Sequence, residues 1–246
     1  MCVIFLAWQA DPRWPLVAAA NRDEFHGRPT EAARWRGDIF CGLDLRAGGT
    51  WLGIHLSGRF AAVTNFRDGD IAPAPRSRGD LPLSFLQGTA SPQAYAEQVA
   101  RDGDQYGGFN LLVGDRDSLW HLNNRGAAPQ PLAPGIHGLC NGQLDEPWPK
   151  VVRGTQALTQ VLAEGGDAQA LAALLQDRHQ PDDAALPATG VALEVERMVA
   201  PIFINAPHYG TRASSLVWLP ATGSPQMVEQ RWDAAGAALG SSDSRH

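Results

Sequence analysis

The sequence predicts an α+β fold in which β-sheets pack beneath helices, and two observations support this class. Predicted strands and helices occur in blocks along the chain, in the order β, α, β, α, β, and do not alternate strictly. The first predicted strands are continuous apolar runs, which is typical of strands covered on both faces. The composition does not change abruptly anywhere, so we expect a single domain over residues 1–246, ending in a flexible tail at about 239–246.

The amino-terminal quarter of the chain carries strand signals. Residues 2–8 and 16–20 are apolar runs of strand length, separated by a turn that opens at Asp11–Pro12. Residues 50–64 form a predicted hairpin. Residues 67–80 are rich in Pro, Gly, Asp and Arg, which predicts a loop.

Two helices are predicted next, and strands and helices then follow in further blocks. The first helix covers residues 81–87. The second begins at Ser91–Pro92, where an N-cap serine precedes a proline at the first helical position, and ends near Arg101. Residues 150–163 place apolar side chains at helical spacing, and residues 167–178 form a further short helix. The other predicted segments are strands at 109–113, 118–122, 135–139, 202–205, 214–219 and 226–232 and a polar loop at 179–190.

Composition and charge exclude several classes of function. The chain has 20 Lys and Arg against 26 Asp and Glu, a formal net charge of −6, which argues against a sequence-independent nucleic-acid binder and against an anionic membrane surface as partner. No apolar run approaches the roughly 18 residues of a membrane span, and the apolar start lacks the basic leader of a secretory signal. Three cysteines without C-x-x-C spacing fit a reducing compartment, so we expect a cytoplasmic location. Seven histidines show no metal-ligand spacing, so no metal site is predicted.

Cys2 is the first candidate for chemistry. Removal of Met1 would place a thiol and a free α-amino group in one residue. A free α-amine titrates near pH 8, against about 10.4 for lysine, so it can act as a base at neutral pH and activate the thiol. The alternative is that Cys2 is a small hydrophobic residue that begins a strand.

A polar string, Asn21-Arg22-Asp23-Glu24, directly follows the second apolar run. If the strand 2–8 pairs with 16–20, this string returns beside Cys2. A carboxylate there could hold the terminal ammonium, and an arginine could lower the pKa of the thiol. The alternative is a solvated turn that contains an Arg–Asp ion pair.

These residues carry a resemblance to a known family. The start Met1-Cys2 and the string at 21–24 resemble the NRDE family, also called the transport and Golgi organization protein 2 family. Further strings that agree with the family pattern, in order over nearly the whole chain, are Gly49-Thr50-Trp51-Leu52-Gly53, Thr64-Asn65-Phe66-Arg67, Gly138-Leu139-Cys140-Asn141, Leu144-Asp145-Glu146-Pro147-Trp148-Pro149-Lys150-Val151 and Tyr209-Gly210-Thr211-Arg212.

The family is in turn similar to the N-terminal-nucleophile (Ntn) hydrolases, especially the cysteine branch with penicillin V acylase and bile salt hydrolase. The resemblance implies a four-layer αββα sandwich with two antiparallel sheets between helical layers. It also implies that Cys2 is the nucleophile and that Asp23 positions the terminal amine. The branch's arginine falls on Ala20 in this chain. Arg22 is a candidate substitute, although we expect its side chain to leave the strand in a different direction.

The resemblance also implies roles for three residues farther along the chain. Asn65 and Asn141 match the residues whose amides bind the oxyanion, and Arg212 matches a late arginine that supports the site. Amide donors that are fixed at strand ends suit this task, because the oxygen of a tetrahedral intermediate becomes negatively charged and is stabilised by donors held in place. A lone asparagine can instead be a turn residue that bonds its own backbone.

Two functions therefore remain open. The first is a hydrolase that cleaves a non-peptide C–N amide bond, with an ester or thioester as a variant, through a thioester at Cys2 and without a cofactor. The second is a non-catalytic binding protein on the same scaffold for haem or a lipid or acyl compound, because the family is associated with haem trafficking and lipid homeostasis. Either function has a small molecule as partner, and the sequence does not specify the substrate or the oligomeric state.

Overall fold

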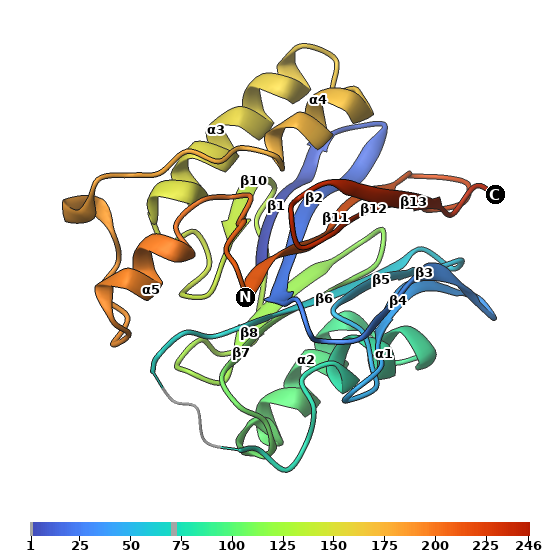
Figure 1. Cartoon of the computed structure of the whole chain (residues 1–246). Helices are drawn as coiled ribbons and strands as arrows, with labels where there is room; N and C mark the ends of the chain where they lie inside the picture. Colours follow the sequence, from blue (N-terminus) through green and yellow to red (C-terminus); the bar gives the residue numbers. More distant parts are fainter. Residues whose placement is uncertain (1, 70–72) are drawn as a thin grey trace.

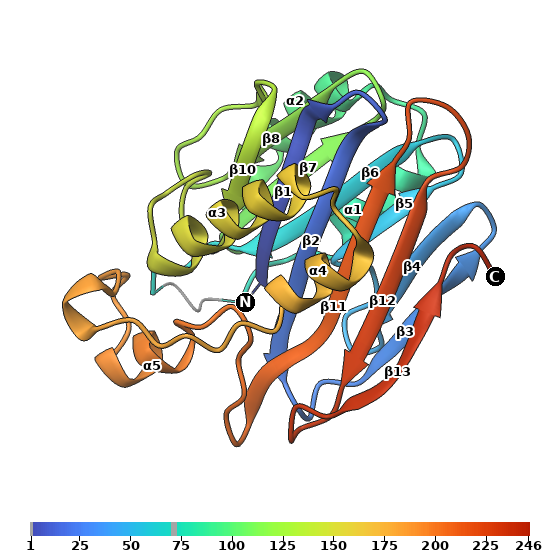
Figure 2. The same ribbon diagram turned by 90° about the horizontal axis from the view of Figure 1, so that it is seen from above.

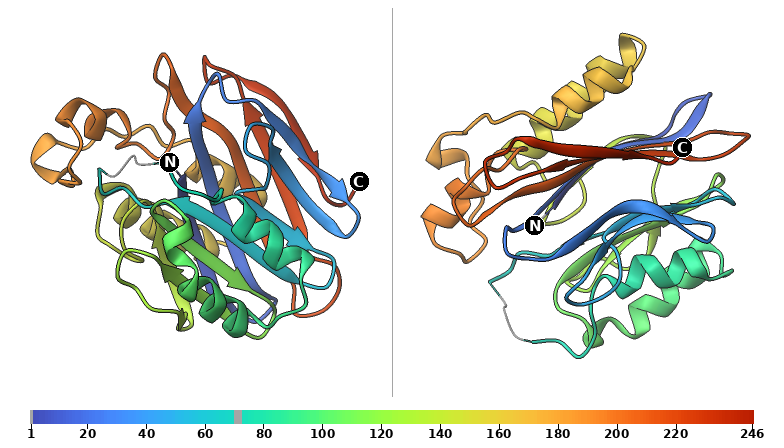
Figure 3. Two further views of the ribbon diagram at one scale, coloured as in Figure 1. Left: turned by 90° about the horizontal axis from the view of Figure 1, so that it is seen from below. Right: turned by 45° about the vertical axis from the view of Figure 1, so that its right-hand side comes forward.

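The computed structural model describes residues 2–69 and 73–246. Met1, whose removal is predicted, and residues 70–72 of the predicted loop lie outside the described residues. In the described chain two antiparallel sheets pack face to face, and helices cover the outer face of each (Figure 1). The right-hand view of Figure 3 shows these four layers edge-on. The structure therefore confirms the predicted α+β class and the αββα order of layers.

The first sheet runs in the order β10-β1-β2-β11-β12-β13, and these strands lie side by side in Figure 2. Their bounds are β10 Gly135–Leu139, β1 Cys2–Asp11, β2 Trp14–Phe25, β11 Tyr209–Leu219, β12 Gln226–Trp232 and β13 Ala238–Asp243. The second sheet has the strands β3 Thr30–Arg36, β4 Ile39–Asp44, β5 Leu52–His55, β6 Arg59–Asn65, β7 Phe109–Gly114, β8 Leu119–Asn123 and β9 Gln130–Pro131, in that order.

Helices cover both sheets. Helices α3 (Pro149–Ala163) and α4 (Ala168–Leu174) lie on the first sheet, and α1 (Asp80–Gln87) and α2 (Pro92–Arg101) lie on the second. A short helix, α5 (Leu193–Met198), precedes β11. Among the described helices none combines the length and the apolar character that crossing a bilayer requires.

The apolar run of β1 is buried on both faces, as predicted. Ile4 and Leu6 point into the core between the two sheets. Val3 and Phe5 point the other way, into the core beneath α3 and α4. A Cβ on Gly154 of α3 would lie 2.1 Å from the Phe5 ring, so this glycine allows the helix to approach the strand closely. Because β1 packs into both cores, its position is fixed, and with it the position of its first residue, Cys2.

The predicted flexible tail is wrong. Residues 238–243 form β13, which pairs antiparallel with β12. Ser244 extends this attachment, because its backbone N–H donates to the Met227 carbonyl at 2.9 Å and its carbonyl accepts from the Trp35 indole at 2.9 Å. The small polar side chains suggested fraying, but the unpaired edge of β12 supplies backbone partners that composition does not reveal.

The predicted strand at 202–205 is also wrong, and residues 202–204 form an irregular buried segment instead. Side chains satisfy its backbone. The Ile202 carbonyl accepts from the Asn21 amide at 2.9 Å, and the Ile204 N–H donates to the Thr211 hydroxyl at 2.9 Å. Only Asn205 of this segment forms a β-bridge, to Gly210. The predicted helix at 167–178 ends earlier, at Leu174 of α4.

His121 of β8 gives the fold a pH dependence. The side chain is fully buried, its Nε2 lies 3.1 Å from Asn110 Oδ1, and burial lowers its pKa from 6.5 to about 4. Between these two pH values the unfolded state binds a proton that the folded state does not, so stability falls as pH falls. We expect the free energy of unfolding to drop by about 3 kcal/mol between pH 7 and pH 4 through this group. Urea unfolding at both pH values, for wild type and His121→Gln, measures the difference. Equal drops in the two proteins would contradict this assignment.

Candidate functional site

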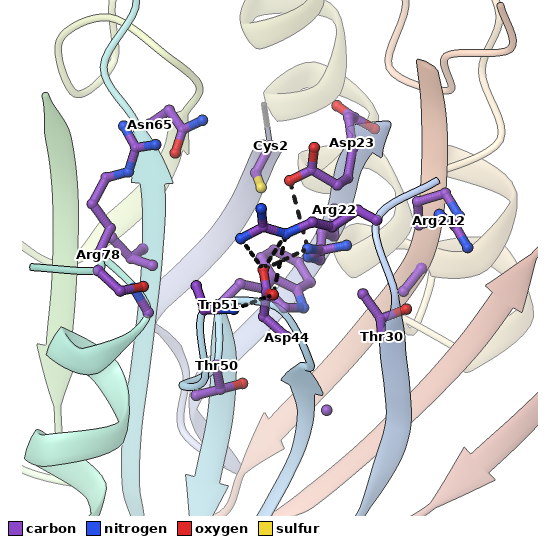
Figure 4. Close-up of a pocket in the computed structure, with 18 of the residues that line it drawn as sticks. Cys2, Arg22, Asp23, Thr30, Asp44, Thr50, Trp51, Asn65, Arg78 and Arg212 are labelled. Atoms are coloured by element: carbon purple, nitrogen blue, oxygen red, sulfur yellow. Dashed lines mark hydrogen bonds and ion pairs between the residues drawn. The ribbon is translucent and has the colours of Figure 1, made fainter. Parts of the chain in front are cut away.

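A cavity of about 950 Å³ opens between the two sheets, where β1 begins and β6 ends. Its lining includes most of the predicted site residues, and these are Cys2, Arg22, Asp23, Asn65 and Arg212. Figure 4 shows Cys2 between Asn65 on one side and Arg212 on the other. The structure thus gathers residues from β1, β2, β6 and β11, which belong to two different sheets.

Cys2 and Arg22 occupy directly opposite positions in the β1–β2 ladder. Opposite residues of an antiparallel pair point to the same face, so both side chains face the cavity between the sheets. Residues two apart on a strand also share a face, and Ala20 indeed lies in the inter-sheet core. The expectation that Arg22 leaves the strand in a different direction from residue 20 is therefore wrong. Arg22 projects from the same face, one step nearer to Cys2.

Asp23 is held rigidly at the end of the β2–β11 ladder. Its side chain is 1% exposed, and its Oδ1 accepts a hydrogen bond from the Thr211 hydroxyl at 2.8 Å. Its backbone carbonyl accepts from the Tyr209 hydroxyl, also at 2.8 Å. Burial raises the pKa of the Asp23 carboxyl, while the positive charge of Lys150 acts in the opposite direction. The carboxyl group is thus fixed in place beside the amino-terminal end of β1.

The Cys2 thiol is 8% exposed and lies in the wall of the cavity. Burial raises the pKa of this thiol to about 11, the negative charge of Asp23 adds to the effect, and Arg22 opposes it. A thiol with this pKa is protonated at neutral pH. Its use as a nucleophile therefore requires a base within reach.

Asn65 and Asn141 meet where the two sheets join. The amide Nδ2 of Asn141 donates to the backbone carbonyl of Asn65 at 2.8 Å, and Asn141 Oδ1 accepts from the Cys140 thiol at 3.4 Å. Thr64 donates from its hydroxyl to the Cys140 carbonyl at 2.6 Å and strengthens the same junction. Asn65 lines the cavity, whereas Asn141 is buried behind it.

Arg212 reaches the cavity through an irregularity in β11. The register with β2 shifts between Thr211 and Ala213, which leaves Arg212 as an extra residue in the strand. Such a bulge redirects a side chain. The guanidinium donates from Nη1 to the carbonyls of Phe25 and His26, at 3.1 and 2.9 Å, and so binds the end of β2.

Arg22 is held by carboxylates rather than by the thiol. Its Nη2 lies 3.6 Å from both Glu24 and Asp44, and Asp44 also binds Arg28 at 2.9 Å. The dashed lines in Figure 4 show part of this network. A cation fixed in this way supplies positive charge close to Cys2, and this charge lowers the pKa of the thiol. The alternative of a solvated turn is wrong, because Asn21, Arg22 and Asp23 are largely or fully buried.

Two groups of site residues were not predicted. Arg78, which lies just before α1, lines the cavity. Arg67 also lines the cavity and forms a buried ion pair with Glu196 of α5, at 3.1 Å. The sequence placed both arginines in one loop. Arg67 belongs to the family string Thr64-Asn65-Phe66-Arg67, which could have indicated a role at the site. Its partner Glu196 lies 129 residues away, and no local sequence pattern indicates this pairing.

Comparison with known proteins finds similar sequences over nearly the whole chain. A family model described as Transport and Golgi organisation 2 matches residues 1–234. The Transport and Golgi organization protein 2 homolog of Bos taurus is 35% identical over 257 residues, covering 94% of this chain and 92% of that protein.

Solved structures show the same fold at low sequence identity. A Caenorhabditis elegans N-acylethanolamine-hydrolyzing acid amidase ortholog has a TM-score of 0.55 with 12% identity and covers 90% of this chain and 94% of its own. A mutant conjugated bile acid hydrolase from Clostridium perfringens has a TM-score of 0.50 with 9% identity and covers 92% and 88%. This chain therefore shares the fold of these two proteins. The family match and the relative together show that the chain belongs to the Transport and Golgi organisation 2 family.

Proposed function

We propose that this protein is an amide hydrolase that uses Cys2 as nucleophile after removal of Met1. The observation that carries the proposal is the placement of a cavity-facing thiol on the first strand beside a buried, hydrogen-bonded carboxyl group, Asp23. The substrate class is a non-peptide acyl amide, with an ester or thioester as a variant.

The proposed acylation step uses the α-amine of Cys2 as base. The sulfur attacks the carbonyl carbon and forms a C–S bond while the thiol proton passes to the amine. The C–N bond of the tetrahedral intermediate then breaks, and the leaving nitrogen takes the proton from the ammonium. A thioester at Cys2 and a free amine result. Asp23 orients the amine through its charge.

Hydrolysis of the thioester completes the cycle. The α-amine takes a proton from water as the oxygen attacks the thioester carbon. The C–S bond breaks, the sulfur recovers the proton, and a carboxylic acid is released. The raised pKa of Cys2 makes a neighbouring base necessary in the first step, which supports this division of roles.

The oxyanion is assigned chiefly to Asn65. Its amide is at the cavity wall, whereas Asn141 lies behind it and donates to its backbone carbonyl. The sequence predicts both amides as donors. The geometry favours Asn65 as donor, with Asn141 fixing the strand end from which Asn65 projects. Arg22 and Arg212 supply positive charge on the opposite side of the thiol.

Acyl transfer to Cys2 tests the proposal. Protein without Met1, treated with p-nitrophenyl octanoate, is expected to gain one octanoyl group on Cys2, read by intact mass and peptide mapping. Cys41 and Cys140 serve as internal controls, because both are buried free thiols that do not line the cavity. A matched protein with one extra residue before Cys2 lacks the base and should label at least about 100-fold more slowly. Equal labelling of the two proteins would exclude the proposed base.

The second candidate is a carrier for haem or a lipid or acyl compound. The cavity volume favours this candidate, because about 950 Å³ is at the upper end of sites that enclose drug-sized ligands. A carrier need not react at Cys2. Titration of haem into wild type and Cys2→Ala, followed by absorbance, should then give equal affinities. Treatment of wild type with p-nitrophenyl octanoate should leave Cys2 unlabelled.

A further inference from the structure

Arg78 lies in the cavity wall, and the backbone next to it packs closely against the backbone of another segment. Gly49 and Gly79 pack backbone to backbone, and a Cβ on Gly49 would lie 2.4 Å from the carbonyl carbon of Gly79. The Thr50 N–H donates to the Gly79 carbonyl at 3.0 Å. Gly49 has φ +76°, a conformation that favours glycine. The two glycines therefore set the position of Arg78 relative to the start of β5.

The guanidinium of Arg78 rests on a second glycine pair. Its Nη1 donates to the Gly108 carbonyl at 3.1 Å. A Cβ on Gly107 would lie 3.4 Å from the same nitrogen, which is ordinary van der Waals contact, so the head group packs against the backbone of this pair. Arginine carries five N–H donors, and this contact uses one of them.

Arg78 has no carboxylate partner among the described residues, whereas three other arginines of the cavity wall have one. Within residues 2–69 and 73–246 Arg78 forms no ion pair, whereas Arg22 and Arg28 are paired with Asp44. Arg67 is paired with Glu196. Burial lowers the pKa of Arg78, while the negative charge of Glu24 raises it. The group remains a cation at neutral pH.

A purely structural role explains this arrangement poorly. One hydrogen bond to a carbonyl could be made by a neutral amide, without the cost of partly burying a charge. Figure 4 shows Arg78 on the side of the pocket where Asn65 lies, across from Arg212. A cation that packs on glycine backbone, faces a cavity and has one hydrogen-bond partner among the described residues is arranged to receive an anion.

We propose that Arg78 binds an anionic group, a carboxylate or a phosphate, on the acyl compound that enters the cavity. The inference rests on the proposed function for the identity of the ligand as an acyl compound, and it specifies that this compound carries a negative charge. The planar guanidinium would bind either anion through two parallel N–H donors.

Binding to the non-reactive Cys2→Ala variant tests the inference independently of catalysis. The carboxylate probe pair is N-octanoylglycine and N-octanoylglycinamide, which differ in one charge. The phosphate pair is N-octanoylethanolamine phosphate and N-octanoylethanolamine. Calorimetric titration is expected to give at least about tenfold tighter binding of the charged member of one pair, and the preferred pair identifies the anion.

Variants that remove or keep the charge of Arg78 show whether this residue causes the preference for the charged probe. In Cys2→Ala, a further Arg78→Gln change should reduce the ratio of affinities to about one, and Arg78→Lys should retain part of it. Arg101→Gln, at the exposed end of α2, removes the same net charge and should leave the ratio unchanged. Thermal unfolding checks that each variant is folded. A preference that survives Arg78→Gln, or the absence of any preference in Cys2→Ala, would overturn the inference. Failure of wild type to acylate Cys2 would instead count against the proposed function alone.

Discussion

Asp23→Asn is expected to slow acylation of Cys2 by about 10²- to 10⁴-fold, the contribution that a positioned acid–base system typically makes. The substitution keeps the size of the side chain and removes its charge. The carboxylate is the group proposed to orient the α-amine, and it is 1% exposed, so water does not substitute for it. Release of p-nitrophenol from p-nitrophenyl octanoate, followed in the first turnover of protein without Met1, measures the rate.

The hydrogen bond from Thr211 provides a matched control for this prediction. Thr211→Val removes the hydroxyl that donates to Asp23 Oδ1 and leaves the carboxylate charge in place. We expect a loss of only about tenfold, the equivalent of one hydrogen bond. If both variants slowed acylation by the same factor, the effect would come from the packing of the Asp23 side chain and not from its charge. If Asp23→Asn acylated at the wild-type rate, the proposed base would not depend on Asp23.

Strands with continuous apolar runs were predictable from sequence, whereas the edge strands β3 and β13 were not. The apolar runs of β1 and β2 are evident because both faces of these strands are buried. β3 lies at the edge of its sheet, contains Arg34 and Arg36, and is mostly half-buried, so its composition resembles a surface loop. The tail strand β13 went unpredicted for a similar reason, because its pairing depends on β12 and not on its own side chains.

The residues of the candidate site likewise divide into those that the sequence predicts and those that it does not. Cys2 and Asp23 were predictable because the pairing of two adjacent strands follows from the turn between them. Arg78 was not predictable, because its significance comes from glycines in two other segments that only the fold brings together. The burial of Asn141 behind Asn65 also depends on the contact between the two sheets. Local sequence thus indicates the reacting group, whereas tertiary structure determines what surrounds it.

The second large expected effect is on stability, at the buried ion pair between Arg67 and Glu196. Their side chains are 6% and 4% exposed, and the Arg67 guanidinium also stacks over the Trp148 ring at 4.6 Å. Arg67→Met would leave the Glu196 carboxylate buried without this cation. We expect a loss of about 3–5 kcal/mol in the free energy of unfolding, measured by urea denaturation.

A double-mutant cycle isolates the pair, because Arg67 has other interactions that Arg67→Met also removes. Glu196→Gln keeps an oxygen that can accept from the Thr189 hydroxyl and removes the charge. Combined with Arg67→Met, it should cost at least about 1.5 kcal/mol less than the sum of the single losses, since neither charge is then left alone. Additive losses would mean that the two charges do not interact.

The same pair connects stability to the site. The backbone N–H of Arg67 donates to the Asn141 carbonyl at 2.6 Å, and Asn141 in turn donates to the backbone of Asn65. A side chain anchored on α5 therefore fixes the strand end that presents the proposed oxyanion donor. At a temperature where Arg67→Met remains folded, we expect acylation to slow while probe binding by the matching Cys2→Ala protein changes little. That split distinguishes misplacement of Asn65 from general loosening, because loosening would weaken binding as well.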